Sequence, residues 1–122
     1  MVFEKLKYSW NRRRYNKCIN ACKHDCKDIL EVIKTEEKSI TPLIRGAMGA
    51  YAKKYFNRLI NSAKKTDYIS KKLGKTANLE QEVRTFREKY YTYSSNKNSI
   101  LLPNVFNFIE EFEQYAQELN KR

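Results

Sequence analysis

Glycine and proline are scarce in this chain, and their scarcity limits the fold more than any other feature. Only 3 Gly and 2 Pro occur among 122 residues. Sandwiches and barrels need turn formers about every 8–12 residues, so a few long helices are favoured instead. Hydrophobic residues are 41% and charged residues 32% of the chain, which is enough apolar material for one packed core. We therefore predict an all-α fold that forms a single domain over residues 1–122.

Four segments place apolar residues at helical spacing. We predict helices over about residues 2–34, 42–65 and 79–91, and a fourth helix with Pro103 in its first turn. Thr41 and Pro42 are a strong start signal for the second helix. Polar breaks are expected at residues 35–39, 66–78 and 92–99. Because short connections favour antiparallel neighbours, we predict an up-down bundle of four or five helices.

Apolar spacing also predicts which side chains are buried. The first helix has apolar residues at steps of mostly three or four: Phe3, Leu6, Trp10, Cys18, Cys22, Cys26, Ile29, Leu30 and Ile33. The second helix has a similar stripe: Leu43, Ala47, Ala50, Tyr51, Tyr55, Leu59 and Ala63. Gly46 and Gly49 predict the close approach of a neighbouring helix. The adjacent carboxylates Glu36 and Glu37 are predicted to face solvent.

Positive charge is concentrated in the first part of the chain. Residues 1–75 hold 19 Lys and Arg against 7 Asp and Glu, whereas residues 76–122 hold 6 against 7. The predicted binding residues are cations interleaved with Tyr and Trp: Arg12, Arg13, Arg14, Lys53, Lys54, Arg58, Lys71, Lys72 and Lys75. Cations hold phosphates and aromatic faces stack on unpaired bases, so the mixture suits RNA or single-stranded DNA. An acidic protein partner and a merely solvated Lys-rich surface are the alternatives.

Residues that would support metal or cofactor chemistry are poorly placed. Cys18 and Cys26 lie eight residues apart, about 12 Å along a helix, which is too far for one metal ion. His24 is the single histidine and is flanked by charges, so we predict a surface position for it. No phosphate-binding glycine loop or dinucleotide fingerprint is present. We predict no metal, no cofactor and buried thiols that act as small core residues.

We expect no targeting signal and no membrane span in this sequence. Charges at Glu4, Lys5 and Lys7 interrupt the N-terminus, and no apolar stretch approaches the roughly 20 residues of a transmembrane helix. A cytoplasmic location is therefore expected.

Residues 40–99 resemble the bacterial helical domains of the HEPN family. The likeness lies in Ile44 to Ala47 with the aromatic residues that follow, and in the stretch from Leu79 to Ser94. The family's motif is an Arg, a polar residue and a His four to six residues after the Arg. Arg87 and Glu88 match its first two positions, but Tyr93 stands where the His would fall.

The resemblance implies a metal-independent ribonuclease or its inactive relative, often a homodimer. Tyr titrates near pH 10 and is a poor substitute for an imidazole, so the non-catalytic relative is favoured, with Arg87 and Tyr93 as degenerate site residues. The main prediction is a small, non-catalytic binding module that uses the basic face of its first two helices. An immunity or antitoxin-like bundle that neutralises a toxin is a further alternative, by analogy of architecture only.

Overall fold

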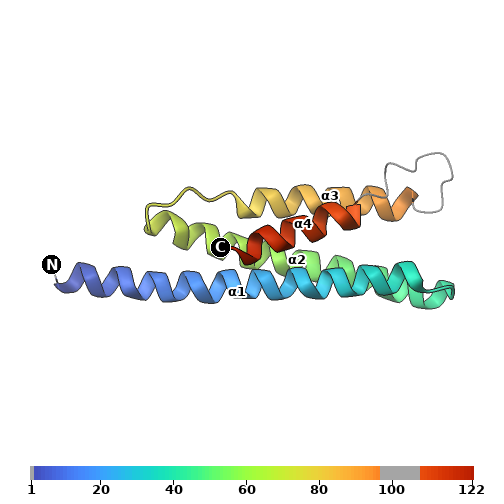
Figure 1. Ribbon diagram of the computed structural model, residues 1–122, viewed down its shortest axis with the longest axis horizontal. Coiled ribbons are helices and arrows are strands. Elements are labelled where there is room, and N and C mark those ends of the chain that lie inside the picture. The colour runs from blue at the N-terminus through green and yellow to red at the C-terminus, as the bar shows by residue number, and fades with distance from the viewer. Residues whose placement is uncertain (1, 97–107) are drawn as a thin grey trace.

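The computed structural model describes residues 2–96 and 108–122, which form four helices. These are α1 (Val2–Lys38), α2 (Pro42–Lys72), α3 (Leu79–Asn96) and α4 (Phe108–Asn120). Each helix runs back along the direction of the one before it, and α1 is the longest (Figure 1). α1 packs against α2 and α4, and α3 packs against the same two helices. The predicted all-α up-down bundle is confirmed, with four helices in the described residues.

Local sequence signals explain where α2 begins and ends. Pro42 is the first helical residue, as predicted, and Thr41 before it is extended, with φ −90° and ψ 119°. The Thr41 side chain makes no capping hydrogen bond, so the expected capping by Thr41 was wrong. At the other end Gly74 has a φ of +71°, a left-handed conformation that favours glycine. The Lys75 N–H donates to the Ser70 carbonyl at 2.9 Å and the Gly74 N–H donates to the Lys71 carbonyl at 3.1 Å. This pair of bonds is a Schellman motif, which ends the helix.

Three helices continue further than the sequence predicted. α1 ends at Lys38 rather than 34, α2 at Lys72 rather than 65, and α3 at Asn96 rather than 91. The expected breaks were therefore wrong over residues 35–38, 66–72 and 92–96, whereas residue 39 and residues 73–78 are not helical, as expected. Polar residues continue the buried faces there, because Glu36, Thr66 and Ser70 are buried in line with the apolar residues before them. Pro103 lies outside the described residues.

Aromatic rings from α2, α3 and α4 form the centre of the core. The Phe56 ring lies 5.4 Å from that of Tyr90 and 5.5 Å from that of Phe112, measured between centroids. Phe86 and Phe112 are 5.3 Å apart in an edge-to-face arrangement. α1 closes this cluster with the buried apolar residues Ile19, Cys22, Cys26, Ile29 and Ile33. Such aromatic pairs stabilise a core beyond the area that they bury.

The predicted apolar stripes were wrong at their N-terminal ends. Phe3, Leu6 and Trp10 are exposed, although they follow the same step pattern as the buried cysteines. Trp10 and Cys18 are eight positions apart, a separation that turns a helix about 80° beyond two full turns, so the two groups lie on different faces.

The α2 stripe was also assigned partly to the wrong face. Leu59 and Ala63 are buried as predicted, but Leu43, Ala47, Ala50 and Tyr51 are exposed. From Leu59 the buried face continues in the N-terminal direction to three other residues: Phe56, Ala52 and Gly49. Steps of three and of four from Leu59 lead to Phe56 and Tyr55 respectively, and both are aromatic, so spacing alone did not separate them.

The predicted close approach of helices occurs at one of the two glycines. A Cβ atom at Gly49 would lie 3.5 Å from Glu36 Oε1 and 3.6 Å from the Tyr90 hydroxyl. At Gly46 a Cβ atom would meet nothing within 4 Å. Gly49 therefore lets α2 lie against Glu36 of α1 and Tyr90 of α3. None of the described helices combines the length and the apolarity needed to cross a membrane.

Candidate nucleic-acid interface

The outer face of α2 carries a straight row of cations. We name it the α2 cation row, and it consists of Lys54, Arg58, Lys65 and Lys72, all of them exposed. Their separations of four, seven and seven residues are close to whole numbers of helical turns, so the side chains fall on one line. At about 1.5 Å per residue the row is about 27 Å long. Lys54, Arg58 and Lys72 were predicted binding residues, and Lys65 completes their line.

Tyrosine rings accompany the α2 cation row. The exposed Tyr51 and Tyr68 lie near its two ends, and Tyr51 stacks on Tyr55 with ring centroids 6.3 Å apart. The Lys72 Nζ atom is 4.6 Å from the Tyr68 ring centroid, and the Arg58 guanidinium carbon is 5.9 Å from the Tyr55 centroid. Cation–π contacts of this kind hold the charged groups beside flat apolar faces.

Little negative charge opposes these cations on α2. Between Pro42 and Lys72 the helix has eight Lys and Arg but a single acidic residue, Asp67. The Asp67 carboxylate accepts hydrogen bonds from the backbone N–H groups of Leu79 at 3.0 Å and Glu80 at 2.9 Å. It is therefore occupied at the N-terminus of α3, whose free N–H groups favour an anion there.

The other predicted cations do not form one continuous surface with the α2 cation row. Arg12, Arg13 and Arg14 are consecutive on α1, so their side chains leave the helix about 100° apart. Arg14 is half-buried, with its guanidinium carbon 4.6 Å from the Trp10 ring centroid.

The cations that neighbour the row in sequence differ in their surroundings. Lys71 is exposed beside Lys72. Lys75 follows α2 and lies over the Tyr15 ring of α1 at 5.0 Å. Lys53 lies over the Tyr91 ring of α3 at 5.7 Å and so faces away from the α2 cation row.

Arg87 and Tyr93, the degenerate motif residues, lie on different sides of α3. One Nη atom of Arg87 donates to the Asn57 Oδ1 atom of α2 at 3.0 Å. Tyr93 is only 1% exposed; its ring stacks on Phe108 at 5.6 Å and its hydroxyl donates to Glu37. Burial, followed by the hydrogen bond to Glu37, raises the pKa of Tyr93 above its ordinary value. The HEPN resemblance stays a prediction, and this placement does not bring its two residues together.

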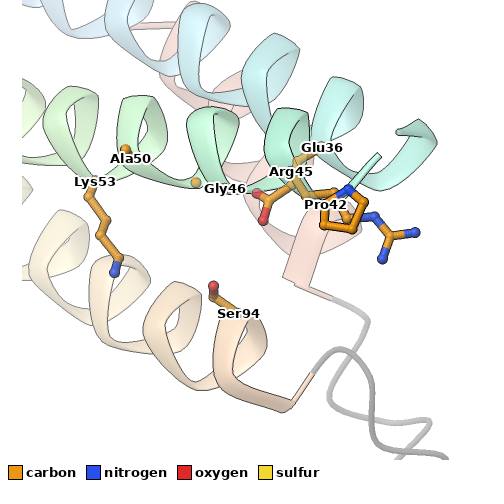
Figure 2. A pocket seen from close by; sticks show the side chains of 8 residues that line it. Glu36, Pro42, Arg45, Gly46, Ala50, Lys53 and Ser94 are labelled. Carbon is orange, nitrogen blue, oxygen red and sulfur yellow. The ribbon is translucent and has the colours of Figure 1, made fainter. Parts of the chain in front are cut away.

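A groove lies where the end of α1 meets the first half of α2 and the end of α3 (Figure 2). Its volume is about 540 Å³, and we name it the Glu36 groove. Eight residues line it: Glu36, Pro42, Arg45, Gly46, Gly49, Ala50, Lys53 and Ser94. The Arg45 guanidinium extends away from Lys53 and Ser94 (Figure 2), and its Nε atom donates to the Ser39 carbonyl.

Glu36 is the largest departure from the sequence prediction. It was predicted to face solvent but is only 2% exposed, and its Oε2 atom accepts a hydrogen bond from the Tyr90 hydroxyl at 3.3 Å. Burial and the charge of Glu36 raise the pKa of Tyr90. Acid–base catalysis near pH 7 needs a group with a pKa near 7, and the raised pKa values of Tyr90 and Tyr93 lie further from that range than the pKa of an ordinary tyrosine. The sequence held one signal, because Ile29, Ile33 and Glu36 recur at steps of four and three.

The cysteines and the histidine lie where the sequence analysis predicted, apart from Cys18, which is half-buried. Cys22 and Cys26 are buried, and Cys22 Sγ lies 3.5 Å from the Thr66 hydroxyl. His24 is exposed, with its Nε2 atom 3.4 Å from Asp28 Oδ2. In the described part of the chain, His, Cys, Asp and Glu side chains form no group of three that could hold a metal ion.

Comparison of the chain with protein-family models, curated proteins and solved structures gives no significant match. Function is therefore inferred from the geometry of this molecule alone.

Proposed function

We propose that the protein is a non-catalytic binding module that holds single-stranded nucleic acid, RNA in particular, along the α2 cation row. One observation supports this proposal above the others: four exposed cations lie on a single line beside exposed tyrosine rings. The only carboxylate of α2 is already bonded to the N-terminus of α3. From Lys54 to Lys72 the outer face of this helix therefore presents positive charge with no free carboxylate of its own.

The two kinds of side chain have different tasks in such a complex. The cations neutralise phosphates and release their counterions, which gives affinity without regard to sequence. Tyr51 and Tyr68 offer faces on which unpaired bases stack, at about 1–3 kcal/mol per base. Bases in a duplex are already stacked on one another, so single strands profit more from these rings.

Charge reversal along the row tests the proposal. The variant Lys54→Glu/Arg58→Glu/Lys65→Glu is compared with Lys17→Glu/Lys27→Glu/Lys121→Glu, which makes the same charge change at exposed positions outside α2. Affinity for a fluorescent single-stranded RNA is measured by anisotropy over a range of salt concentrations. We expect the row variant to bind at least about tenfold more weakly and to lose about two units of salt slope, because each phosphate contact contributes about 0.7.

Equal losses of RNA affinity in both variants would contradict a local site and indicate attraction by net charge alone.

A second experiment, on the tyrosines, distinguishes a nucleic-acid partner from an acidic protein partner. Replacement of Tyr51 and Tyr68 by Ala removes stacking faces but no charge, so we expect about tenfold weaker binding to RNA for each stacked base lost. An unchanged affinity for RNA in this double variant would exclude base stacking at the row.

A further inference from the structure

The first three turns of α1 carry an apolar surface that the core does not use. We name it the N-terminal apolar stripe, and it consists of Val2, Phe3, Leu6 and Trp10, which are 75%, 79%, 65% and 58% exposed. At about 100° per residue these side chains fall within an arc of about 100°. The buried residues of α1 between 22 and 33 lie roughly opposite that arc. The N-terminal end of α1 also extends beyond the turn that ends α2 (Figure 1).

Cations flank the N-terminal apolar stripe. Residues 2–17 contain six Lys and Arg and one acidic residue, Glu4, a balance of +5. Lys5 lies beyond one border of the stripe, and Arg14 lies beyond the other with its guanidinium over the Trp10 ring. Arg13 and Lys17 follow the stripe along the same face. A helix with Trp, Phe and Leu on one face and Lys and Arg around them is the pattern of segments that lie in a membrane interface.

We propose that the first turns of α1 bind the surface of an anionic lipid membrane, with the N-terminal apolar stripe inserted at the level of the lipid headgroups. The cations beside the stripe contact the negative headgroups, while the indole of Trp10 occupies the boundary between polar and apolar layers. The helix lies in the plane of the surface, because its exposed apolar side chains share one face and cations border them.

A second copy of the chain and a nucleic acid fit this surface less well. Pairing two such helices would bring two segments of charge +5 side by side, and like charges repel. Nucleic acid satisfies the cations and can stack on Phe3 or Trp10. It offers no partner for the aliphatic side chains of Val2 and Leu6, whereas a lipid surface satisfies both kinds of group.

Trp10 is the only tryptophan of the chain, so its fluorescence reports directly on this surface. The full chain is mixed with phosphatidylcholine vesicles that contain or lack phosphatidylglycerol, and emission and co-sedimentation are both recorded. We expect a blue shift and co-sedimentation with the anionic vesicles, at least about tenfold stronger than with neutral ones. Each cation removed from residues 5–14 weakens binding about fivefold, which is about 1 kcal/mol per Lys or Arg.

Matched substitutions locate the contact. Leu6→Glu places a charge in the N-terminal apolar stripe, and Leu43→Glu makes the same change at an exposed position of α2. We expect Leu6→Glu to reduce vesicle binding at least about tenfold and Leu43→Glu to leave it nearly unchanged. Both side chains are exposed, so both variants should fold, and circular dichroism confirms this. The row variant Lys54→Glu/Arg58→Glu/Lys65→Glu should still bind vesicles, which separates this surface from the proposed nucleic-acid interface.

Four outcomes would overturn the proposal. The first is equal binding of Leu6→Glu and the parent chain to anionic vesicles, and the second is the absence of binding to either vesicle. The third is a blue shift that depends on protein concentration without lipid, which would indicate a second copy as the occupant. The fourth is a shift with single-stranded RNA but none with vesicles, which would assign the surface to nucleic acid.

Discussion

Burial divides the three cysteines into two kinds of thiol. Cys18 is half-buried, whereas Cys22 and Cys26 are fully buried. Burial raises the pKa of Cys22 to about 11 despite its hydrogen bond to Thr66, and it raises the pKa of Cys26 as well. The thiolate is the reactive form, so at pH 8 a pKa of about 11 leaves only about one Cys22 side chain in a thousand reactive. We expect one fast-reacting thiol, Cys18, when the native protein is treated with Ellman's reagent.

The other two thiols should react only as fast as the protein unfolds. In denaturing urea all three should react together, which calibrates the measurement. Cys18→Ser should remove the fast phase and leave the slow one. A fast phase that persists in Cys18→Ser would show that the α1 face carrying Cys22 and Cys26 opens readily.

Glu36 illustrates what sequence reasoning misses at the scale of one residue. Two neighbouring glutamates are usually solvated, and Glu37 is indeed exposed. Glu36 is buried because it continues the line of Ile29 and Ile33, and because Tyr90 brings a hydroxyl within 3.3 Å from a helix 54 residues away. Helical spacing could have indicated the burial of Glu36. The partner that makes its burial tolerable depends on packing, so the sequence alone could not identify it.

At the scale of the element, Asp67 joins the end of α2 to the start of α3. Its two carboxylate oxygens accept from the N–H groups of Leu79 and Glu80. Removal of such a cap typically costs about 1–2 kcal/mol, and the negative charge also favours this helix terminus. We expect Asp67→Ala to lower the free energy of unfolding by about that amount in urea denaturation followed by circular dichroism.

Two further variants make the capping test specific. Asp67→Asn keeps one oxygen acceptor without the charge, so its loss should be smaller than that of Asp67→Ala. Asp28→Ala removes a carboxylate whose Oδ2 atom lies 3.4 Å from Nε2 of the exposed His24, and its effect should stay within about 0.5 kcal/mol. If Asp67→Ala changed stability no more than Asp28→Ala, the carboxylate would not be needed at the start of α3.

The sequence predicted the existence of each helix more reliably than the positions of the helix ends. The start of α2 was predicted because Pro42 acts locally at the first helical position. Its end was placed too early because polar residues after 65 suggested a break, although Gly74 was the true stop signal. Thr66 and Ser70 continue the buried face, and their burial depends on contacts with other helices. Where contacts with other helices determine the end of a helix, local sequence signals alone cannot predict it.

At the scale of the whole molecule, the predicted binding cations divide between different surfaces. Three of the nine predicted binding residues, Lys54, Arg58 and Lys72, lie in the α2 cation row. The helical spacing of the row could also be recognised in the sequence, because Lys65 lies seven residues from both Arg58 and Lys72. The sequence could not show that Lys53 faces α3, since that requires the position of the Tyr91 ring. Composition indicates how much charge a chain carries, and only packing determines which charges share a surface.

The buried Tyr90 and Tyr93 and the half-buried Tyr115 couple the stability of the bundle to alkaline pH. Burial is the main cause that raises the pKa of Tyr90, Tyr93 and Tyr115 above the ordinary value of about 10. The folded protein then holds protons that the unfolded chain releases above that pH. The resulting stability is complete below about pH 10 and is lost as pH rises towards the folded pKa values, by up to about 1.4 kcal/mol per pH unit for each tyrosine.

Deprotonation of lysines acts in the opposite direction, because it relieves the repulsion within a chain of net charge +11. A comparison of the parent chain with Tyr93→Phe separates the two effects, since both chains carry the same lysines. Below about pH 10 Tyr93→Phe should be less stable, because it lacks the hydroxyl that donates to Glu37. Above about pH 10 this difference in unfolding free energy, measured in urea, should shrink as pH rises, because only the parent has to keep Tyr93 protonated. A difference that stays constant through the alkaline range would contradict a raised pKa for Tyr93.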